Sequence, residues 1–235
     1  MKTVRMTHDL RRELILGAAK RCFALHGYAG TTTKSVAAAA AISEGLLFKH
    51  FPSKLALFAE ILSEECEADT KLLELRGLEP STATLVLLIR RMVEYYVHIA
   101  DAPAEEDAQR LRLVISSQLG DGEFARMLYG KMGEMLGSIF SASLDQAIRN
   151  GEATRVGAGD SALNLLWFVH HTLAMAASTQ LPVATCLTYL NPAGLDRQLA
   201  EFTLRGIGLN ETAIASHLDR AATADMMRPE TTESA

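Results

Sequence analysis

Two short helical segments with a three-residue turn between them leave residues 33–50 few ways to fold. The segment 33–40 follows three threonines, whose hydroxyls are favoured helix N-caps. After the turn at 41–43 a second segment covers 44–50, and Ser43 can cap it in the same way. Two capped helices joined by so short a turn have the geometry of a helix-turn-helix.

The apolar residues of both segments support this interpretation. Val36, Ala37 and Ala40 give the first helix a side of small apolar residues, which lets the second helix approach closely. Leu47 and Phe51, four positions apart, can hold the second helix to the same core. The other positions of the second helix then face outward, where a recognition helix meets the edges of DNA bases.

A longer helix is predicted before this pair, because Ile15, Ala19 and Phe23 recur on one stripe of the helical period. Gly27 ends it as a left-handed cap. Larger helices follow, with prolines between them. The predicted helices are 9–26, 33–40, 44–50, 53–76, 81–100, 104–119, 123–150, 160–178 and 195–216.

The composition also indicates an all-α fold. Alanine and leucine, which favour helices, number 35 and 34 of 235 residues, whereas valine and isoleucine, which favour strands, number 19 together. The three cysteines are widely spaced, which excludes a complete disulfide framework and a paired zinc motif. The first residues are polar and carry no secretory signal, so we expect a cytoplasmic protein.

The net charge of −5 is unevenly distributed. Residues 1–60 hold nine lysines and arginines against four acidic residues, a net charge of about +5. The rest of the chain holds 14 basic and 24 acidic residues and is therefore strongly acidic. This asymmetry indicates a polyanionic partner for the N-terminal part alone.

The stretch 11–58 carries a specific pattern of apolar, glycine and threonine positions. Its members are Ile15, Ala19, Phe23, Gly27, Tyr28, Thr31, Thr32, Val36, Ala37, Ile42, Ser43, Gly45, Leu46, Leu47, Phe48, His50, Phe51, Lys54, Leu57 and Phe58. With this pattern the stretch resembles the DNA-binding domain of the TetR/AcrR family of bacterial transcriptional regulators. The resemblance implies an all-α homodimer, in which an N-terminal three-helix helix-turn-helix domain is followed by a C-terminal helical bundle that binds a ligand and dimerises.

We therefore expect three parts in the chain. Residues 1–58 form the DNA-binding domain, and residues 1–8 are its flexible basic arm. Residues 59–220 form the ligand-binding and dimerisation domain. Residues 221–235 form a disordered tail, because they are polar and follow the last predicted helix.

The resemblance also implies which side chains contact DNA, at the start of the first short helix and on the outward face of the second. They are Thr32, Lys34, Glu44, Gly45, Leu46, Phe48, Lys49, His50 and Lys54. The arginines that we expect to reach the DNA backbone or minor groove from the arm are Arg5, Arg11 and Arg12.

Three residues depart from the family's pattern. Ala41 stands where a glycine is usual, and a left-handed conformation there would cost an alanine roughly 1 kcal/mol. Phe48 replaces a tyrosine and so lacks a hydroxyl for a phosphate. Glu44 replaces a residue that is often basic; its carboxylate can accept from cytosine N4 but repels phosphate. We expect a modest affinity for DNA or an unusual operator.

The helix predicted over 160–178 is apolar on all sides, which indicates that it is covered on two of them. With the helix 195–216 it matches the two dimerisation helices of the family. The residues expected at the dimer interface are Phe168, His171, Thr172, Met175, Phe202 and Arg205. A two-fold dimer presents its recognition helices about 34–36 Å apart, which is one turn of DNA.

A ligand of a helical bundle binds between helices, among apolar side chains with a few polar groups. The residues expected to line such a site are Met92, Tyr95, Tyr96, Leu113, Leu119, Met135, Phe140, Trp167 and His170. Plain core packing would explain each of them as well. If they line a site, their mixture of methionine, leucine and aromatic side chains favours an apolar or amphipathic small molecule.

Together these features predict a ligand-responsive transcriptional repressor that binds a pseudo-palindromic operator as a homodimer. A transcriptional activator, or a DNA-binding regulator without an effector, fits the same fold. An enzyme or a helical carrier would need a constellation of acids, nucleophiles or metal ligands that the sequence lacks, so we expect no catalytic residues, no metal and no cofactor. We also expect no membrane partner, because no apolar segment is long enough to span a bilayer.

Overall fold

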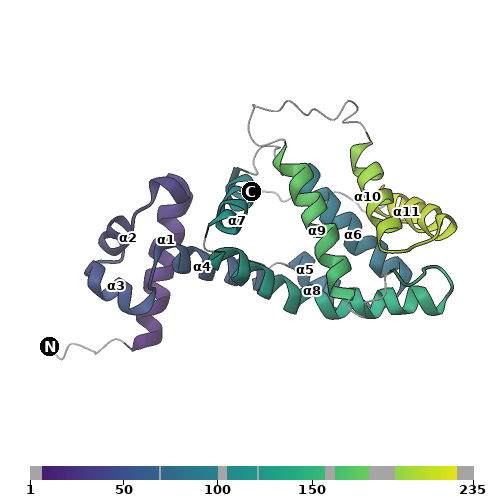
Figure 1. Ribbon diagram of the computed structural model, residues 1–235. Coiled ribbons are helices and arrows are strands. Elements are labelled where there is room, and N and C mark those ends of the chain that lie inside the picture. Colours follow the sequence, from purple (N-terminus) through teal and green to yellow (C-terminus); the bar gives the residue numbers. More distant parts are fainter. Residues whose placement is uncertain are drawn as a thin grey trace. The chain divides into compact units, whose positions relative to one another are not determined.

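The computed structural model describes residues 7–68, 70–99, 105–120, 122–156, 162–179 and 194–226 (Figure 1). These residues form α-helices, so the predicted all-α fold is confirmed. The helices are α1 (His8–Gly30), α2 (Thr33–Ala39), α3 (Glu44–His50), α4 (Lys54–Ala68), α5 (Thr70–Arg76), α6 (Thr82–Val97), α7 (Glu105–Leu119), α8 (Glu123–Arg149), α9 (Ala162–Ser178), α10 (Leu195–Gly206) and α11 (Glu211–Met226). Within the described ranges, no helix combines the length and the apolar character needed to cross a bilayer.

The described residues pack as two compact units. The N-terminal unit comprises Met1–Leu73 with Glu106–Met132, and the C-terminal unit comprises Glu74–Glu105 with Gly133–Ala235. The first turns of α8 therefore belong to the N-terminal unit and its remaining length to the C-terminal unit. This grouping differs from the predicted boundary between residues 58 and 59, which stays a prediction of where the DNA-binding part ends.

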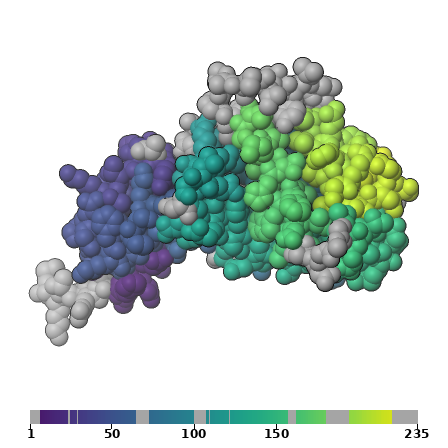
Figure 2. Space-filling model, in the orientation of Figure 1, coloured from purple at the N-terminus to yellow at the C-terminus, as the bar shows by residue number. Residues whose placement is uncertain are grey.

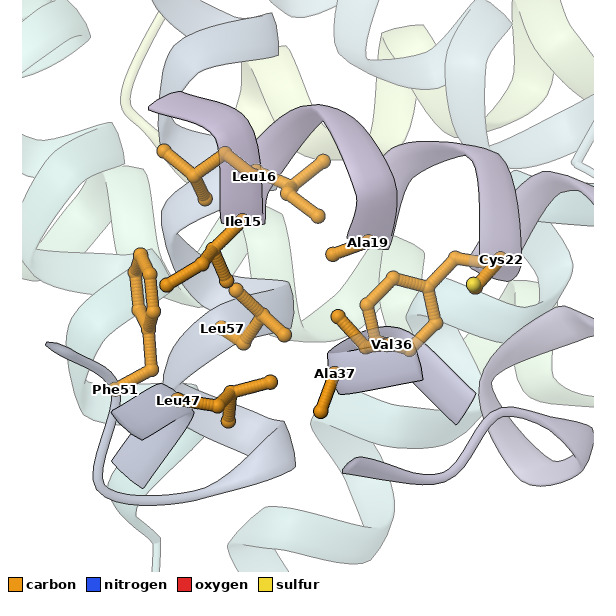
Figure 3. Close-up of a cluster of buried hydrophobic side chains, with 11 residues drawn as sticks. Ile15, Leu16, Ala19, Cys22, Val36, Ala37, Leu47, Phe51 and Leu57 are labelled. Carbon is orange, nitrogen blue, oxygen red and sulfur yellow. The ribbon is translucent and has the colours of Figure 1, made fainter. Parts of the chain in front are cut away.

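The first four helices of the N-terminal unit enclose one hydrophobic core (Figure 3). Ile15, Ala19 and Cys22 of α1 face Val36 of α2 and Leu47 of α3, and all five are buried. Burying a side chain such as leucine or isoleucine contributes about 1.5–3 kcal/mol. The predicted apolar stripe of the first helix is thus confirmed, and it fixes both short helices against α1.

A second core of the same unit lies between α4, α7 and the start of α8. Its members include Ala59 of α4, Val114 of α7 and Phe124 of α8. Phe58 packs against both cores, because its ring centroid lies 4.8 Å from that of Phe23 and 6.1 Å from that of Phe124. One aromatic side chain therefore connects the core of the helix-turn-helix to the first turns of α8.

In the C-terminal unit α6 packs against α9, α10 and α11. Two glycines of α8 let α9 approach closely. A methyl group at Gly137 would lie 2.7 Å from the side chain of Leu163, and one at Gly133 would lie 3.3 Å from the ring of Trp167. A larger residue at either position would require the side chain of Leu163 or Trp167 to shift.

The helix predicted over 53–76 corresponds to α4 and α5, which are helical on either side of residue 69, a position outside the described residues. Another predicted helix is interrupted in the structure. The helix predicted over 195–216 ends at Gly206, and α11 starts at Glu211. Between them Gly208 has a φ of 98° and lies so close to the carbonyl of Thr154 that no Cβ would fit. This close approach is the physical reason for the break.

Three helix ends also differ from prediction. Gly27 has the predicted positive φ, 64°, but α1 resumes after it and continues to Gly30. At the other end of α1, the helix already begins at His8, inside the predicted arm. The predicted disordered tail is helical as far as Met226, and residues 227–235 lie outside the described residues.

Candidate nucleic-acid interface

Both short helices are capped by the residues predicted for this task. The Thr32 hydroxyl accepts a hydrogen bond from the main-chain N–H of Ser35 at 3.0 Å, and the Ser35 hydroxyl accepts one from the N–H of Thr32, also at 3.0 Å. The Ser43 hydroxyl accepts from the N–H of Leu46 at 3.2 Å. In the turn, Ala41 has a φ of 53°, which is the left-handed conformation that costs an alanine roughly 1 kcal/mol.

The outward face of α3 is defined by what α3 buries. Leu47 and Phe51, at its inner side, are 0% and 2% exposed. Gly45, Phe48 and Lys49 are exposed, and the Phe48 ring keeps 45% of its surface open to solvent. The exposed Phe48 ring is therefore available for an apolar contact on this face of α3.

The start of α2 adds two polar groups to this surface, Thr32 and Lys34, both exposed. Because the Thr32 hydroxyl acts as an acceptor within the helix cap, its hydrogen remains available to donate to a phosphate oxygen. Lys34 carries a positive charge at the same end of the helix. Both groups fit the predicted contact with the DNA backbone.

Glu44, the first residue of α3, is half-buried and lies against α2. The Thr33 hydroxyl donates a hydrogen bond to Oε1 of its carboxylate at 2.5 Å. This bond joins the first turns of the two short helices. It also fixes the direction in which the carboxylate points.

Lys54 lies elsewhere than on the outward face. Its ammonium donates hydrogen bonds to the carbonyl of Tyr28 at 2.9 Å and to that of Thr31 at 3.0 Å, and it stands 4.1 Å above the Tyr28 ring. Burial lowers the pKa of this lysine. The structure thus gives Lys54 a role in holding the end of α1, and its predicted contact with DNA stays a prediction.

The C-terminal end of α3 is held by Arg12, which lies within α1 rather than on a flexible arm. Its guanidinium donates a hydrogen bond to the carbonyl of His50 at 3.2 Å and pairs with the carboxylate of Glu60 at 2.7 Å. It also lies 4.3 Å from the centroid of the Phe51 ring. One side chain therefore connects α1, α3 and α4.

His50 itself is half-buried next to a group of positive charges. Its ring centroid is 4.4 Å from that of His8. Burial lowers the pKa of His50, and the nearby His8, Arg11 and Arg12 lower it further. The last turn of the recognition helix therefore lies in a positive environment, which suits a polyanion. Of the arginines predicted on the arm, Arg11 lies in α1 like Arg12, and Arg5 lies outside the described residues.

Sequence reasoning missed the positioning roles of Thr33 and Arg12. A signal for Arg12 was present: it precedes Ile15 by three positions and so shares the buried stripe of α1. A charged residue on a buried stripe needs a partner, so its position indicates an internal contact but not the residue that supplies it. Thr33 gave no such signal, because its partner lies eleven positions away on another helix.

Among the residues predicted to line a ligand site, Tyr96 of α6 and His170 of α9 lie together. The Tyr96 hydroxyl is 2.7 Å from Nε2 of His170, and both side chains are buried. Burial, and then the charge of His171, lowers the pKa of His170 to about 4. The ring of Trp167 lies 5.8 Å from that of His170, and the ring of Tyr95 lies 5.1 Å from that of Tyr96.

The other predicted lining residues are spread over both units. Met135 and Phe140 are buried in α8, and Met92 is half-buried in α6. Leu113 and Leu119 belong to α7 in the N-terminal unit, where Leu113 packs against the second core and Leu119 is 85% exposed. The structure therefore groups the aromatic residues and His170, and places the two α7 leucines in a different packing unit.

The residues predicted at the dimer interface are exposed in the single chain. Phe168 and Met175 of α9 are 66% and 63% exposed, and Phe202 of α10 is 63% exposed. Much of the α9 surface lies open on the face drawn in Figure 2. His171 and Thr172 are exposed as well. Arg205, also predicted at the interface, is exposed and pairs with Glu201 and Glu211 of its own chain.

Comparison with known proteins gives matches to regulatory proteins. Residues 15–61 match the family described as "Bacterial regulatory proteins, tetR family". The HTH-type transcriptional repressor Rv1474c of Mycobacterium tuberculosis is 31% identical over 147 residues, which cover 62% of this chain and 69% of that protein. The HTH-type transcriptional repressor AcnR of Corynebacterium glutamicum is 34% identical over 108 residues. That second match covers 46% of this chain and only 50% of AcnR.

A solved structure supports the fold over most of the chain. The protein RolR, crystallised with the ligand resorcinol, superposes with a TM-score of 0.61 at 16% sequence identity. The superposition covers 90% of this chain and 94% of RolR. At this identity the likeness concerns the fold, which includes both packing units.

Proposed function

Because the chain belongs to the tetR family of bacterial regulatory proteins, we propose that it is a transcriptional repressor that responds to a ligand. As a homodimer it binds a pseudo-palindromic operator, with α3 in the major groove and α2 against the DNA backbone. A small molecule that binds the C-terminal unit releases the operator. The observation that carries the proposal is the outward face of α3, where Gly45, Phe48 and Lys49 are exposed.

The chemistry of this face suits DNA. Lys34 and Lys49 supply positive charge for phosphates, and the Phe48 ring supplies an apolar contact for a thymine methyl group. Leu47 holds α3 rigidly to the core, so the face reaches the groove already ordered. Binding then costs little conformational entropy.

The test is a titration of the protein against duplex fragments of the DNA upstream of its own gene. We expect one fragment to bind at least about a thousandfold more tightly than a shuffled duplex of the same composition. Equal affinity for both duplexes would overturn the proposal. The stoichiometry at saturation gives two chains for each operator if the homodimer is correct.

A pair of lysine variants tests which surface contacts the phosphates. Lys49→Ala removes an exposed charge from α3, and we expect it to reduce the slope of log affinity against log salt by about 1. Lys20→Ala is the matched control, because the charge of Lys20 on α1 is already paired, with Glu64 of α4 at 2.8 Å. An unchanged slope for Lys49→Ala would exclude α3 from the interface.

The ligand response is supported by the group around Tyr96 and His170. It combines an apolar, aromatic surrounding with two polar atoms, which is the character of small-molecule sites in helical bundles. RolR, with the same fold, was crystallised with resorcinol. An effector releases the operator only if it binds the state that does not bind DNA more tightly than the state that does.

Trp167 offers a direct test of this ligand response, because it is the only tryptophan of the chain and lies beside His170. We expect small aromatic compounds that release the operator to change its fluorescence with the same midpoint. Trp167→Phe is the control for signals that arise elsewhere. Release of the operator with no change in Trp167 fluorescence would place the effector at another site.

A further inference from the structure

Glu44 brings a negative charge to a surface that is otherwise suited to DNA. It occupies the first position of α3, and its carboxylate is tied to Thr33 of α2. An acidic side chain at such a place weakens binding to phosphates. This cost is offset where the carboxylate meets a hydrogen-bond donor of the DNA. The identity of that donor determines what the side chain does.

The geometry leaves one carboxylate oxygen for a partner outside the protein. The hydrogen bond from Thr33 goes to Oε1 of Glu44, and none of the described residues hydrogen-bonds to Oε2. At the next residue, Gly45 has no heavy atom within 4 Å of the place where a Cβ would lie. The surface of α3 is therefore open at Gly45, and the edge of a base pair can approach the helix closely there.

The chemistry of the major groove then selects the partner. A carboxylate only accepts hydrogen bonds, and the donors in the major groove are the amino groups of cytosine N4 and adenine N6. Adenine carries the acceptor N7 beside its amino group, which repels a second acceptor. Guanine and thymine present acceptors alone. Cytosine is therefore the base that a fixed carboxylate prefers.

We propose that Glu44 is a specificity-determining residue that selects a C·G pair in each half-site of the operator, and that Thr33 is its positioning residue. This inference rests on the proposed function, since it requires α3 to lie in the major groove. Thr33 acts through Glu44: the Thr33 hydroxyl donates its hydrogen bond to Oε1 and so orients Oε2 toward the groove. The acidic residue thus lowers the affinity for DNA in general and raises the selectivity for one base.

The test is a selection of duplexes from a randomised pool, carried out with the unaltered chain and with four variants. These are Glu44→Gln, Glu44→Ala, Thr33→Val and Thr33→Ser. The unaltered chain enriches a two-fold symmetric site with a preferred C·G pair in each half. With Glu44→Gln the preference at that pair changes to A·T, because an amide both accepts from N6 and donates to N7 of adenine.

The remaining variants distinguish a role in base recognition from a role in folding. Glu44→Ala lowers the preference for cytosine by about tenfold and leaves the other enriched positions unchanged. Thr33→Val, which has the same shape without a donor, weakens the preference at the same pair only. Thr33→Ser keeps the hydroxyl and restores the preference. A purely structural role of Thr33 would weaken every position of the motif together.

A chemical substitution in the DNA makes the test independent of how the variants fold. The cytosine of the enriched site is replaced by an analogue that lacks the N4 amino group. The unaltered chain loses about tenfold in affinity on this replacement, whereas the affinity of Glu44→Ala does not change. The difference between the two changes measures the coupling between the side chain and the base. Equal losses for both proteins would overturn the inference.

The outcomes also distinguish the inference from the proposed function. If the unaltered chain enriches a motif and both Glu44 variants enrich the same one, the inference is wrong and the proposed function stands. If the unaltered chain enriches no sequence at all, both are wrong.

Discussion

The guanidinium of Arg12 donates a hydrogen bond to the main-chain carbonyl of His50, the last residue of the recognition helix α3. The same guanidinium pairs with Glu60 of α4 and covers the Phe51 ring. The recognition helix is thus held at its start by the bond between Thr33 and Glu44, and at its end by Arg12. Its orientation depends on contacts from three other helices, not on its own seven residues.

Replacing Arg12 by alanine tests this arrangement. We expect Arg12→Ala to lower the free energy of unfolding by about 1–3 kcal/mol, because it removes charge-assisted hydrogen bonds and the contact with Phe51. Affinity for the operator falls more than affinity for nonspecific DNA, since the helix loses its orientation. The measurements are urea denaturation and DNA titrations over a range of salt concentrations.

Lys20→Ala serves as the control for Arg12→Ala, because it removes another charge of α1 that is paired with a carboxylate of α4, that of Glu64. If Arg12 contacts phosphates instead of positioning α3, Arg12→Ala will reduce the salt slope by about 1, and specific and nonspecific binding will weaken equally.

The left-handed Ala41 predicts a stabilising substitution. Ala41→Gly relieves the contact between Cβ and the backbone at a φ of 53°, and we expect the free energy of unfolding to rise by about 1 kcal/mol. Ala38→Gly, at an exposed position inside α2, is the matched control and lowers the same quantity by about 0.5–1 kcal/mol. Thermal or urea denaturation measures both. A destabilised Ala41→Gly would show that the turn carries no strain.

A substitution at Gly45 distinguishes an effect on stability from an effect on DNA binding. A methyl group there meets no atom of the protein within 4 Å, and alanine favours the helix, so Gly45→Ala raises the free energy of unfolding by up to about 1 kcal/mol. The same methyl group projects from the outward face of α3. We therefore expect the affinity for the operator to fall by about tenfold or more. Unchanged DNA affinity in a stabilised variant would mean that no DNA approaches α3 at this point.

The exposed apolar face of α9 predicts a charge substitution that separates the dimer. Phe168→Asp places a carboxylate where a 66% exposed ring would be covered by the second chain. Sedimentation of this variant gives half the mass of the unaltered protein, and its affinity for the operator falls. Leu119→Asp, at an apolar position on α7 that is 85% exposed, is the control and leaves the mass unchanged. A dimeric Phe168→Asp would place the interface elsewhere.

The sequence predicted best where the determinants are local. The bounds of α3 agree with the prediction, because Ser43 caps its start and the buried Leu47 lies inside it. The break at Gly208 was missed, because it depends on the carbonyl of Thr154, which lies 54 positions earlier. No helical period in the sequence carries that information.

The same distinction holds for the candidate interface. The outward residues of α3 follow from its period, so the exposure of Phe48 and Lys49 could be predicted. The partners of Lys54 and Arg12 could not, because they are set by how separate helices pack. Arg12 meets His50 across 38 positions of the chain. The internal contacts of both cations were therefore missed, while their predicted contacts with DNA stay predictions.

The buried pair of Tyr96 and His170 predicts how stability depends on pH. The pKa of His170 in the folded chain is about 4, below the ordinary value of 6.5, so the folded chain holds this histidine neutral. Between these two values the unfolded chain binds the additional proton, and the free energy of unfolding decreases as the pH falls from about 6.5 to about 4. The contribution of His170 to this decrease is roughly 3 kcal/mol.

His170→Gln keeps a hydrogen-bonding group near Tyr96 and does not titrate, so it isolates that contribution from those of the other histidines. Urea denaturation between pH 4.5 and 7.5 measures the free energy of unfolding of both proteins. If this quantity depends on pH in the same way for both, protonation of His170 does not destabilise the folded chain.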